Sequence, residues 1–166
     1  MRILFVLEYY YPHIGGVEKL FKMLCEELVE NGHDVTVLTN RYDSKLKKRE
    51  VLKGVKIRRL GFYNRYLFTF FSLPYAVYYA GKAELIHTTS YNAAVPAYLA
   101  ARMRGKKIFI TFHEAWGKLW FKLPFIGNFS RKLFYYYEKF ILGFSFHKFI
   151  AVSEFTKDSL VSSGVN

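Results

Sequence analysis

Hydrophobic residues in this chain follow two patterns: short uninterrupted runs, and longer segments with apolar positions three or four apart. Residues 3–7 form an uninterrupted run, which is typical of a strand buried on both faces of a parallel sheet. Residues 17–29 follow with helical spacing. The apolar side of that helix is formed by Val17, Leu20, Phe21, Leu24 and Leu28. These segments predict the first strand and the first helix of an α/β domain.

The alternation of runs and helical segments continues along the chain. Further strands are predicted at 35–39, 55–60, 84–87, 107–112 and 148–152. Further helices are predicted at 92–104, along a core-facing stripe from Leu133 to Phe144, and after the capping residue Ser153. In the aromatic stretch 63–81, Pro74 either kinks or starts a helix. This order predicts a Rossmann-like α/β fold, a doubly wound parallel sheet in three α/β/α layers.

Composition narrows the class of protein. The chain of 166 residues fits one domain, 1–166, and 52% of its residues are hydrophobic, which excludes a disordered chain. The formal net charge of +12 favours an anionic partner: a membrane surface, a nucleic acid or a phosphorylated substrate. Nucleic acid is disfavoured because no recognised nucleic-acid-binding motif is present. The single cysteine, Cys25, is interpreted as a small buried side chain.

A loop with two adjacent glycines, Gly15 and Gly16, follows the first strand and opens the first helix. Ligands of open α/β sheets bind at this end of the strands, and a helix N-terminus attracts phosphate. The alternative is that the glycines only make a tight turn, and the spacing leaves both interpretations open. Neither the dinucleotide-binding fingerprint nor the P-loop motif is present, which disfavours nicotinamide chemistry and P-loop hydrolysis.

Several segments resemble, in order, the amino-terminal half of family 4 retaining glycosyltransferases. The matching segments are 11–18, 31–39, 86–90, 109–114 and 149–154. The resemblance implies a GT-B fold, in which two Rossmann-like domains face each other across a cleft. It implies that this chain is the acceptor-side domain and that a carboxyl-terminal, nucleotide-sugar-binding domain is absent from it. The isolated domain is then expected to be inactive.

The implied reaction is transfer of a sugar from a nucleotide-diphosphate sugar to an acceptor that is lipid-linked or membrane-proximal. The resemblance implies no resident cofactor and no metal, and the histidine spacing does not suggest a metal site. The rival hypothesis is a non-catalytic, basic Rossmann-like module that binds a membrane surface or another anionic partner.

Candidate site residues follow the strand ends. His113 comes directly after a predicted strand, where a histidine can donate to a sugar hydroxyl or relay a proton, and the resemblance places it in the active site. Gly15 and Gly16 are assigned to the donor diphosphate. The acceptor is assigned to Tyr9, Tyr10, His13 and Glu114. The alternatives are that the tyrosines pack beneath the loop and that His13 is only a turn residue.

An aromatic and basic connection lies between the fifth predicted strand and the long helix. It contains Trp116, Lys118, Trp120, Phe121 and Lys122, which we interpret as a membrane contact. The alternative is burial in the core. The apolar run at the amino terminus is too short for the core of a signal peptide, and the uncharged run 66–81 is too short to span a bilayer. We therefore expect a cytoplasmic protein, or one held peripherally at the inner face of the cell membrane.

Overall fold

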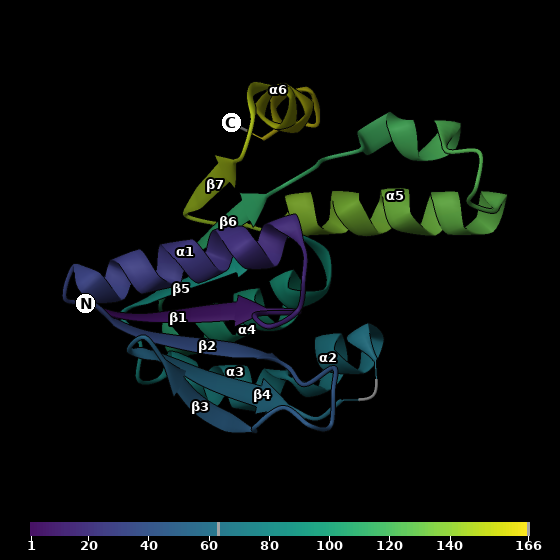
Figure 1. Ribbon diagram of the computed structural model, residues 1–166. Helices are drawn as coiled ribbons and strands as arrows, with labels where there is room; N and C mark the ends of the chain where they lie inside the picture. The colour runs from purple at the N-terminus through teal and green to yellow at the C-terminus, as the bar shows by residue number, and fades with distance from the viewer. Residues whose placement is uncertain (63, 166) are drawn as a thin grey trace.

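The computed structural model describes residues 1–62 and 64–165, so Tyr63, the first residue of the predicted aromatic stretch, lies outside the described residues. The chain forms a seven-stranded sheet in the order β3-β4-β2-β1-β5-β6-β7, with helices on both faces (Figure 1). The strands are β1 (Arg2–Leu7), β2 (Asp34–Asn40), β3 (Arg49–Leu52), β4 (Val55–Leu60), β5 (Leu85–Thr89), β6 (Lys107–Phe112) and β7 (Lys148–Ala151). The helices are α1 (Gly16–Glu30), α2 (Arg65–Phe71), α3 (Leu73–Ala80), α4 (Ala94–Arg104), α5 (Asn128–Leu142) and α6 (Glu154–Ser162), with short 3-10 turns η1 (Tyr91–Ala93) and η2 (Gly117–Lys122).

Strand β1 lies in the middle of the sheet, and its side chains divide between two cores. Ile3, Phe5 and Leu7 pack against α1, whereas Leu4 and Val6 pack on the opposite face with α3 and α4. All five side chains are buried. The uninterrupted apolar run therefore serves both faces of a parallel sheet, and the predicted three-layer α/β/α architecture is confirmed.

One edge of the sheet departs from the predicted all-parallel pattern. β3 pairs antiparallel with β4 through a two-residue turn at Lys53 and Gly54, whose φ angles are 46° and 80°. Two consecutive residues with positive φ form the kind of turn whose twist matches that of the two strands in a hairpin. β3 is short and half exposed, with Val51 turned to solvent, so its hydrophobic alternation is too weak to identify it as a strand.

The aromatic stretch before β5 forms two short helices rather than one. Asn64 caps α2 by accepting a hydrogen bond from the Leu67 amide, and Pro74 lies in the first turn of α3. Proline suits that position because its missing N–H would have no helical partner there. Of the two alternatives for Pro74, the structure shows the helix start.

Helix α5 is less buried than its apolar spacing predicts. Ile141 is buried in the core, but Leu133 and Phe140 are more than half exposed. The amino-terminal part of α5 extends beyond the sheet and packs against η2 (Figure 1). The core-facing stripe predicted from Leu133 to Phe144 is therefore wrong at Leu133 and Phe140, which lie on the outer side of the helix.

No helix in the described part of the chain is long and apolar enough to cross a bilayer. Cys25 is free and buried, as predicted. Burial raises the pKa of its thiol to about 12, which makes it unreactive near neutral pH.

Replacing Phe21 by alanine tests the packing of α1 on the sheet. Phe21 is fully buried, so Phe21→Ala is expected to lower the free energy of unfolding by about 3–5 kcal/mol through lost burial and a cavity. The matched control is Met23→Ala on the exposed side of the same helix, expected to change it by less than about 0.5 kcal/mol. Urea denaturation measures both, and equal losses would contradict the assigned orientation of α1.

Candidate functional site

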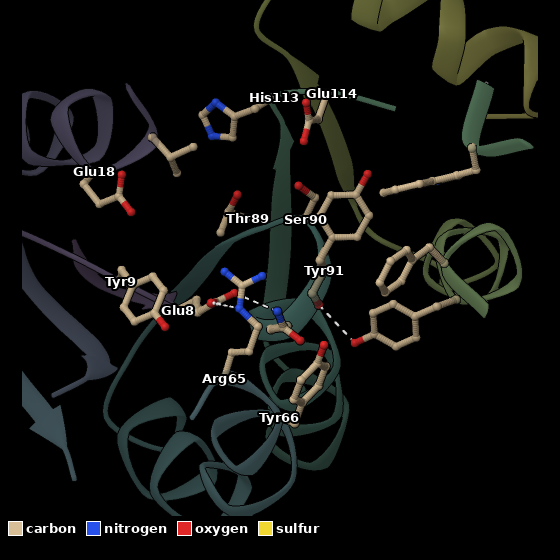
Figure 2. Close-up of a pocket in the computed structure, with 15 residues that line it drawn as sticks. Glu8, Tyr9, Glu18, Arg65, Tyr66, Thr89, Ser90, Tyr91, His113 and Glu114 are labelled. Atoms are coloured by element: carbon tan, nitrogen blue, oxygen red, sulfur yellow. Dashed lines mark hydrogen bonds and ion pairs between the residues drawn. The ribbon is translucent and has the colours of Figure 1, made fainter. Parts of the chain in front are cut away.

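A cavity of about 410 Å³ opens at the carboxyl ends of β1, β5 and β6. The chain runs from β1 to β2 on one side, and β5 flanks β1 on the other, so the strand order reverses at β1. Crevices form at such reversals because the connecting helices leave in opposite directions. Figure 2 shows His113 and Glu18 on one side of this cavity, with Arg65 and Tyr66 on another.

The floor of the cavity holds a paired carboxylate. Glu8 follows β1 directly, and its Oε1 lies 2.9 Å from Nε of Arg65. Asn92 donates from Nδ2 to the other oxygen, Oε2, at 2.8 Å. The side chain of Arg65 is about half exposed (51%). The Asn92 hydrogen bond therefore fixes one carboxylate oxygen, and the Arg65 guanidinium lies against the other as an ion pair, with further N–H donors to offer a ligand.

His113 follows β6 and lines the cavity as predicted from its strand-end position. Its Nε2 is buried without a hydrogen-bond partner in the described part of the chain. Burial lowers the pKa of His113, and the nearby Glu114 and Glu18 carboxylates offset part of that shift. The imidazole is therefore mainly neutral at pH 7, with one ring nitrogen available to a bound hydroxyl.

The glycine loop is organised by Glu18. Gly15 caps α1 with extended backbone, and a Cβ atom there would collide with the Glu18 carboxylate. Nδ1 of His13 lies 3.0 Å from Oε1 of the same carboxylate. A Cβ at Gly16 would meet no atom within 4 Å. Neither glycine lines the cavity, whereas Val17 and Glu18 do, so the donor-diphosphate assignment of Gly15 and Gly16 stays a prediction.

The two tyrosines of the loop have different environments. Tyr9 lines the cavity and stacks on His13, with ring centroids 4.5 Å apart. Tyr10 is 1% exposed and packs in the core with α1, and burial raises the pKa of its hydroxyl. Of the two alternatives for these residues, Tyr9 is placed to meet a ligand and Tyr10 packs beneath the loop. Glu114 is exposed at the cavity rim.

A buried carboxylate, Glu138 of α5, builds the far wall of the cavity. Glu138 is 1% exposed and accepts four hydrogen bonds. The donors are the Tyr91 hydroxyl (2.9 Å), the Trp116 amide (3.0 Å), the Gly117 amide (2.6 Å) and Nε1 of Trp120 (3.1 Å). This one side chain therefore holds the η2 segment against α5 and η1.

Aromatic rings line the wall that Glu138 holds. The rings belong to Tyr91, Trp120, Phe134 and Tyr137, and Tyr66 adds a further ring beside Arg65. Trp120, which the sequence assigned to a membrane contact, lines this cavity instead, because its indole N–H is bonded to Glu138. Trp116 is half-buried beside it, while Lys118, Phe121 and Lys122 are exposed.

Sequence reasoning missed most of the lining. The missed residues are Glu8, Glu18, Arg65, Tyr66, Thr89, Ser90, Tyr91, Asn92, Phe134 and Tyr137. The strand-end rule that selected His113 also applies to Glu8 and to the segment after β5. No sequence signal points to Arg65, the first residue of α2, because nothing in the aromatic stretch indicates that its start lies at the cavity. His87, the last residue of the predicted strand 84–87, is the middle residue of β5 and is buried, with its Nε2 2.8 Å from the Thr111 hydroxyl.

The charge of the cavity differs in sign from that of the chain. Three carboxylates line it, from Glu8, Glu18 and Glu114, against the single guanidinium of Arg65. Carboxylates accept hydrogen bonds from hydroxyl groups, and aromatic faces suit the apolar faces of sugar rings. The cavity is therefore built for a neutral ligand rich in hydroxyls rather than for a free anion. Among residues 1–62 and 64–165, no three or more His, Cys, Asp or Glu side chains gather as metal ligands would.

Comparison with known proteins agrees with this geometry. Residues 14–166 match the model of a family described as Glycosyltransferase Family 4. One relative is a component of the human phosphatidylinositol N-acetylglucosaminyltransferase, 30% identical over 124 residues, which cover 69% of this chain and 26% of that protein. The chain thus spans about a quarter of the length of the curated relatives it matches.

Two solved structures share the fold. Sucrose-phosphate synthase from Thermosynechococcus elongatus superposes over 100% of this chain and 46% of its own, with a TM-score of 0.72 and 17% identity. The catalytic domain of starch synthase IV from Arabidopsis thaliana, bound to ADP and acarbose, matches 68% of this chain and 34% of its own, with a TM-score of 0.55 and 16% identity. Both likenesses show the fold, one half of a GT-B structure, as the resemblance implied.

The pKa of His113 can be measured by NMR titration of the full-length protein. We expect it to lie below the ordinary histidine value of 6.5, because burial disfavours the imidazolium. Glu114→Gln is expected to lower it further, since that carboxylate favours the charged form.

The control for this titration is Glu154→Gln on the exposed start of α6, which should leave the His113 pKa unchanged. A wild-type pKa at or above 6.5 would contradict the burial of the imidazole described here.

Proposed function

Because the chain belongs to glycosyltransferase family 4, we propose that its cavity binds the acceptor of a retaining glycosyl transfer from a nucleotide-diphosphate sugar. The observation that carries this proposal is the half-buried His113, with Nε2 free, beside an acidic and aromatic cavity at the strand reversal. A second domain, as in the GT-B arrangement, supplies most of the donor site and closes the cleft.

The reaction is a substitution at the anomeric carbon of the donor sugar. The acceptor hydroxyl oxygen forms a bond to that carbon, the bond to the diphosphate oxygen breaks, and the hydroxyl proton passes to the leaving phosphate on the same face. Neutral His113 donates a hydrogen bond to a hydroxyl of the transferred sugar and positions it. The amides around Gly15 and Gly16 face the donor diphosphate once the Glu18 carboxylate has moved from Gly15.

The proposed acceptor carries a polyhydroxyl head and an apolar, lipid-linked part. Glu8 and Arg65 offer acceptors and donors to hydroxyls at one end of the cavity, and the wall around Trp120 offers apolar surface at the other. The human relative is named for phosphatidylinositol, a lipid of this general type. The protein then works peripherally at a membrane surface.

His113→Ala in the full-length protein tests the enzymatic proposal. Loss of a group that positions the sugar is expected to lower kcat/KM by about a hundredfold or more. The matched control is His33→Ala, which removes a histidine from the turn before β2, at the opposite end of the strands. Turnover unaffected by His113→Ala would overturn the assigned role and favour the non-catalytic binding module.

Glu8→Gln tests which substrate the cavity binds. The amide cannot accept hydroxyl protons at both atoms, so the KM for the acceptor is expected to rise about tenfold or more. The KM for the nucleotide sugar should stay the same. A raised donor KM with an unchanged acceptor KM would assign the cavity to the wrong substrate.

A further inference from the structure

A line of exposed apolar side chains runs along α5 and the loop before it. We call it the α5 ridge; it consists of Phe125, Phe129, Leu133, Tyr136 and Phe140. Phe125 and Phe129 are each 81% exposed, an unusual state for phenylalanine in water. The last four members are spaced by four, three and four residues, so they share one face of the helix. Figure 1 shows this part of α5 extending beyond the sheet.

The other faces of α5 are already used by the fold. Phe134 and Tyr137 line the cavity, Glu138 holds the η2 segment, and Ile141 enters the core. The ridge therefore contributes little to the packing of this domain; its aromatic contact with the core side is the edge-on pairing of Phe140 with Phe144, at 4.8 Å between ring centroids. A contiguous exposed apolar patch of this kind marks an interaction surface.

The charge around the ridge identifies the kind of partner. Between residues 115 and 153 the chain has six Lys or Arg residues and one acid, Glu138, which is buried and bonded to four donors. The basic residues are Lys118, Lys122, Arg131, Lys132, Lys139 and Lys148. Aromatic side chains flanked by lysines, with no exposed acid in this segment, match the interface of an anionic bilayer.

We infer that the α5 ridge, with the exposed Lys132 and Lys139 next to it on the same helix, docks the protein on an anionic lipid surface. This moves the expected membrane contact from Trp116 and Trp120, which Glu138 holds, to the outer side of α5. The positively charged surface and the acidic cavity then have different partners. The basic surface binds the bilayer, and the acidic cavity binds a neutral head group. The docking surface does not depend on the proposed function. Only the idea that the acceptor comes from the same bilayer rests on it.

Vesicle co-sedimentation of the full-length protein, without donor or acceptor, tests the docking surface. The probes are vesicles of phosphatidylcholine alone and of phosphatidylcholine with phosphatidylglycerol. Binding is expected to require phosphatidylglycerol and to fall as salt is raised. Phe129→Ser combined with Leu133→Ser, and separately Lys132→Glu combined with Lys139→Glu, should each weaken it by about tenfold or more.

Matched controls carry the same changes elsewhere. Leu99→Ser with Met103→Ser removes exposed apolar side chains from α4, and Lys47→Glu with Lys48→Glu reverses charges before β3. Both control pairs should keep most of the vesicle affinity. Loss in the controls equal to that in the ridge variants would overturn the inference, because binding would then follow overall charge or hydrophobicity.

A second measurement covers the case in which a ridge variant fails to fold. Phe129→Trp places a fluorophore on the ridge without removing apolar surface, and its emission should be quenched by lipids brominated in the acyl chains. Absence of quenching with bound vesicles would overturn the inference. So would a ridge buried between two copies of the protein, seen as a dimer that Phe129→Ser and Leu133→Ser dissociate.

The outcomes separate this inference from the proposed function. If the protein glycosylates a water-soluble acceptor but does not bind vesicles, the docking surface is contradicted and the proposed function is not. If vesicle binding depends on the ridge but the protein transfers no sugar from any nucleotide sugar, the proposed function is contradicted and the docking surface is not.

Discussion

The double-sided burial of β1 is the constraint on which the rest of this domain depends. A central parallel strand must present apolar side chains to both layers of helices, so polar groups can appear only where the strand ends. Glu8 and Tyr9 follow the last residue of β1 directly and line the cavity. β5 and β6 end at the same edge, which brings Ser90 and His113 to the same cavity. The site is thus a product of where the strands stop.

That constraint explains which parts of the structure the sequence reveals. Short apolar runs and, at 55–60, alternating apolar positions identified six strands of the sheet, whereas β3 was missed because its four residues are short and half-exposed. The strand-end rule found His113 and Tyr9, and the same rule extends to Glu8. It could not separate Tyr9 from Tyr10, since which of two adjacent tyrosines turns inward depends on the space beneath the loop. Arg65 reaches the cavity from the first turn of the short helix α2, whose place beside the cavity cannot be predicted from spacing along the chain.

Helix α5 shows the limit of reading apolar spacing as burial. Its pattern is that of a core helix along most of its length, yet Leu133 and Phe140 are more than half exposed while Ile141 is buried in the core. Spacing identifies the helix and its faces, whereas the length of the sheet decides which turns are covered.

Net charge is a poor guide to the charge of the site. The chain carries +12, but its cavity is acidic, so the excess positive charge belongs to other surfaces.

Glu138 connects the outer side of α5 with the wall of the cavity. One rigid helix carries the exposed ridge on one side and, on another, the carboxylate that holds Trp120 and Tyr91. A shift of α5 caused by a contact on its outer face would therefore also move the carboxylate that holds the wall of the cavity. Any coupling that results is reciprocal: a ligand that moves the wall would change the outer contact by the same factor.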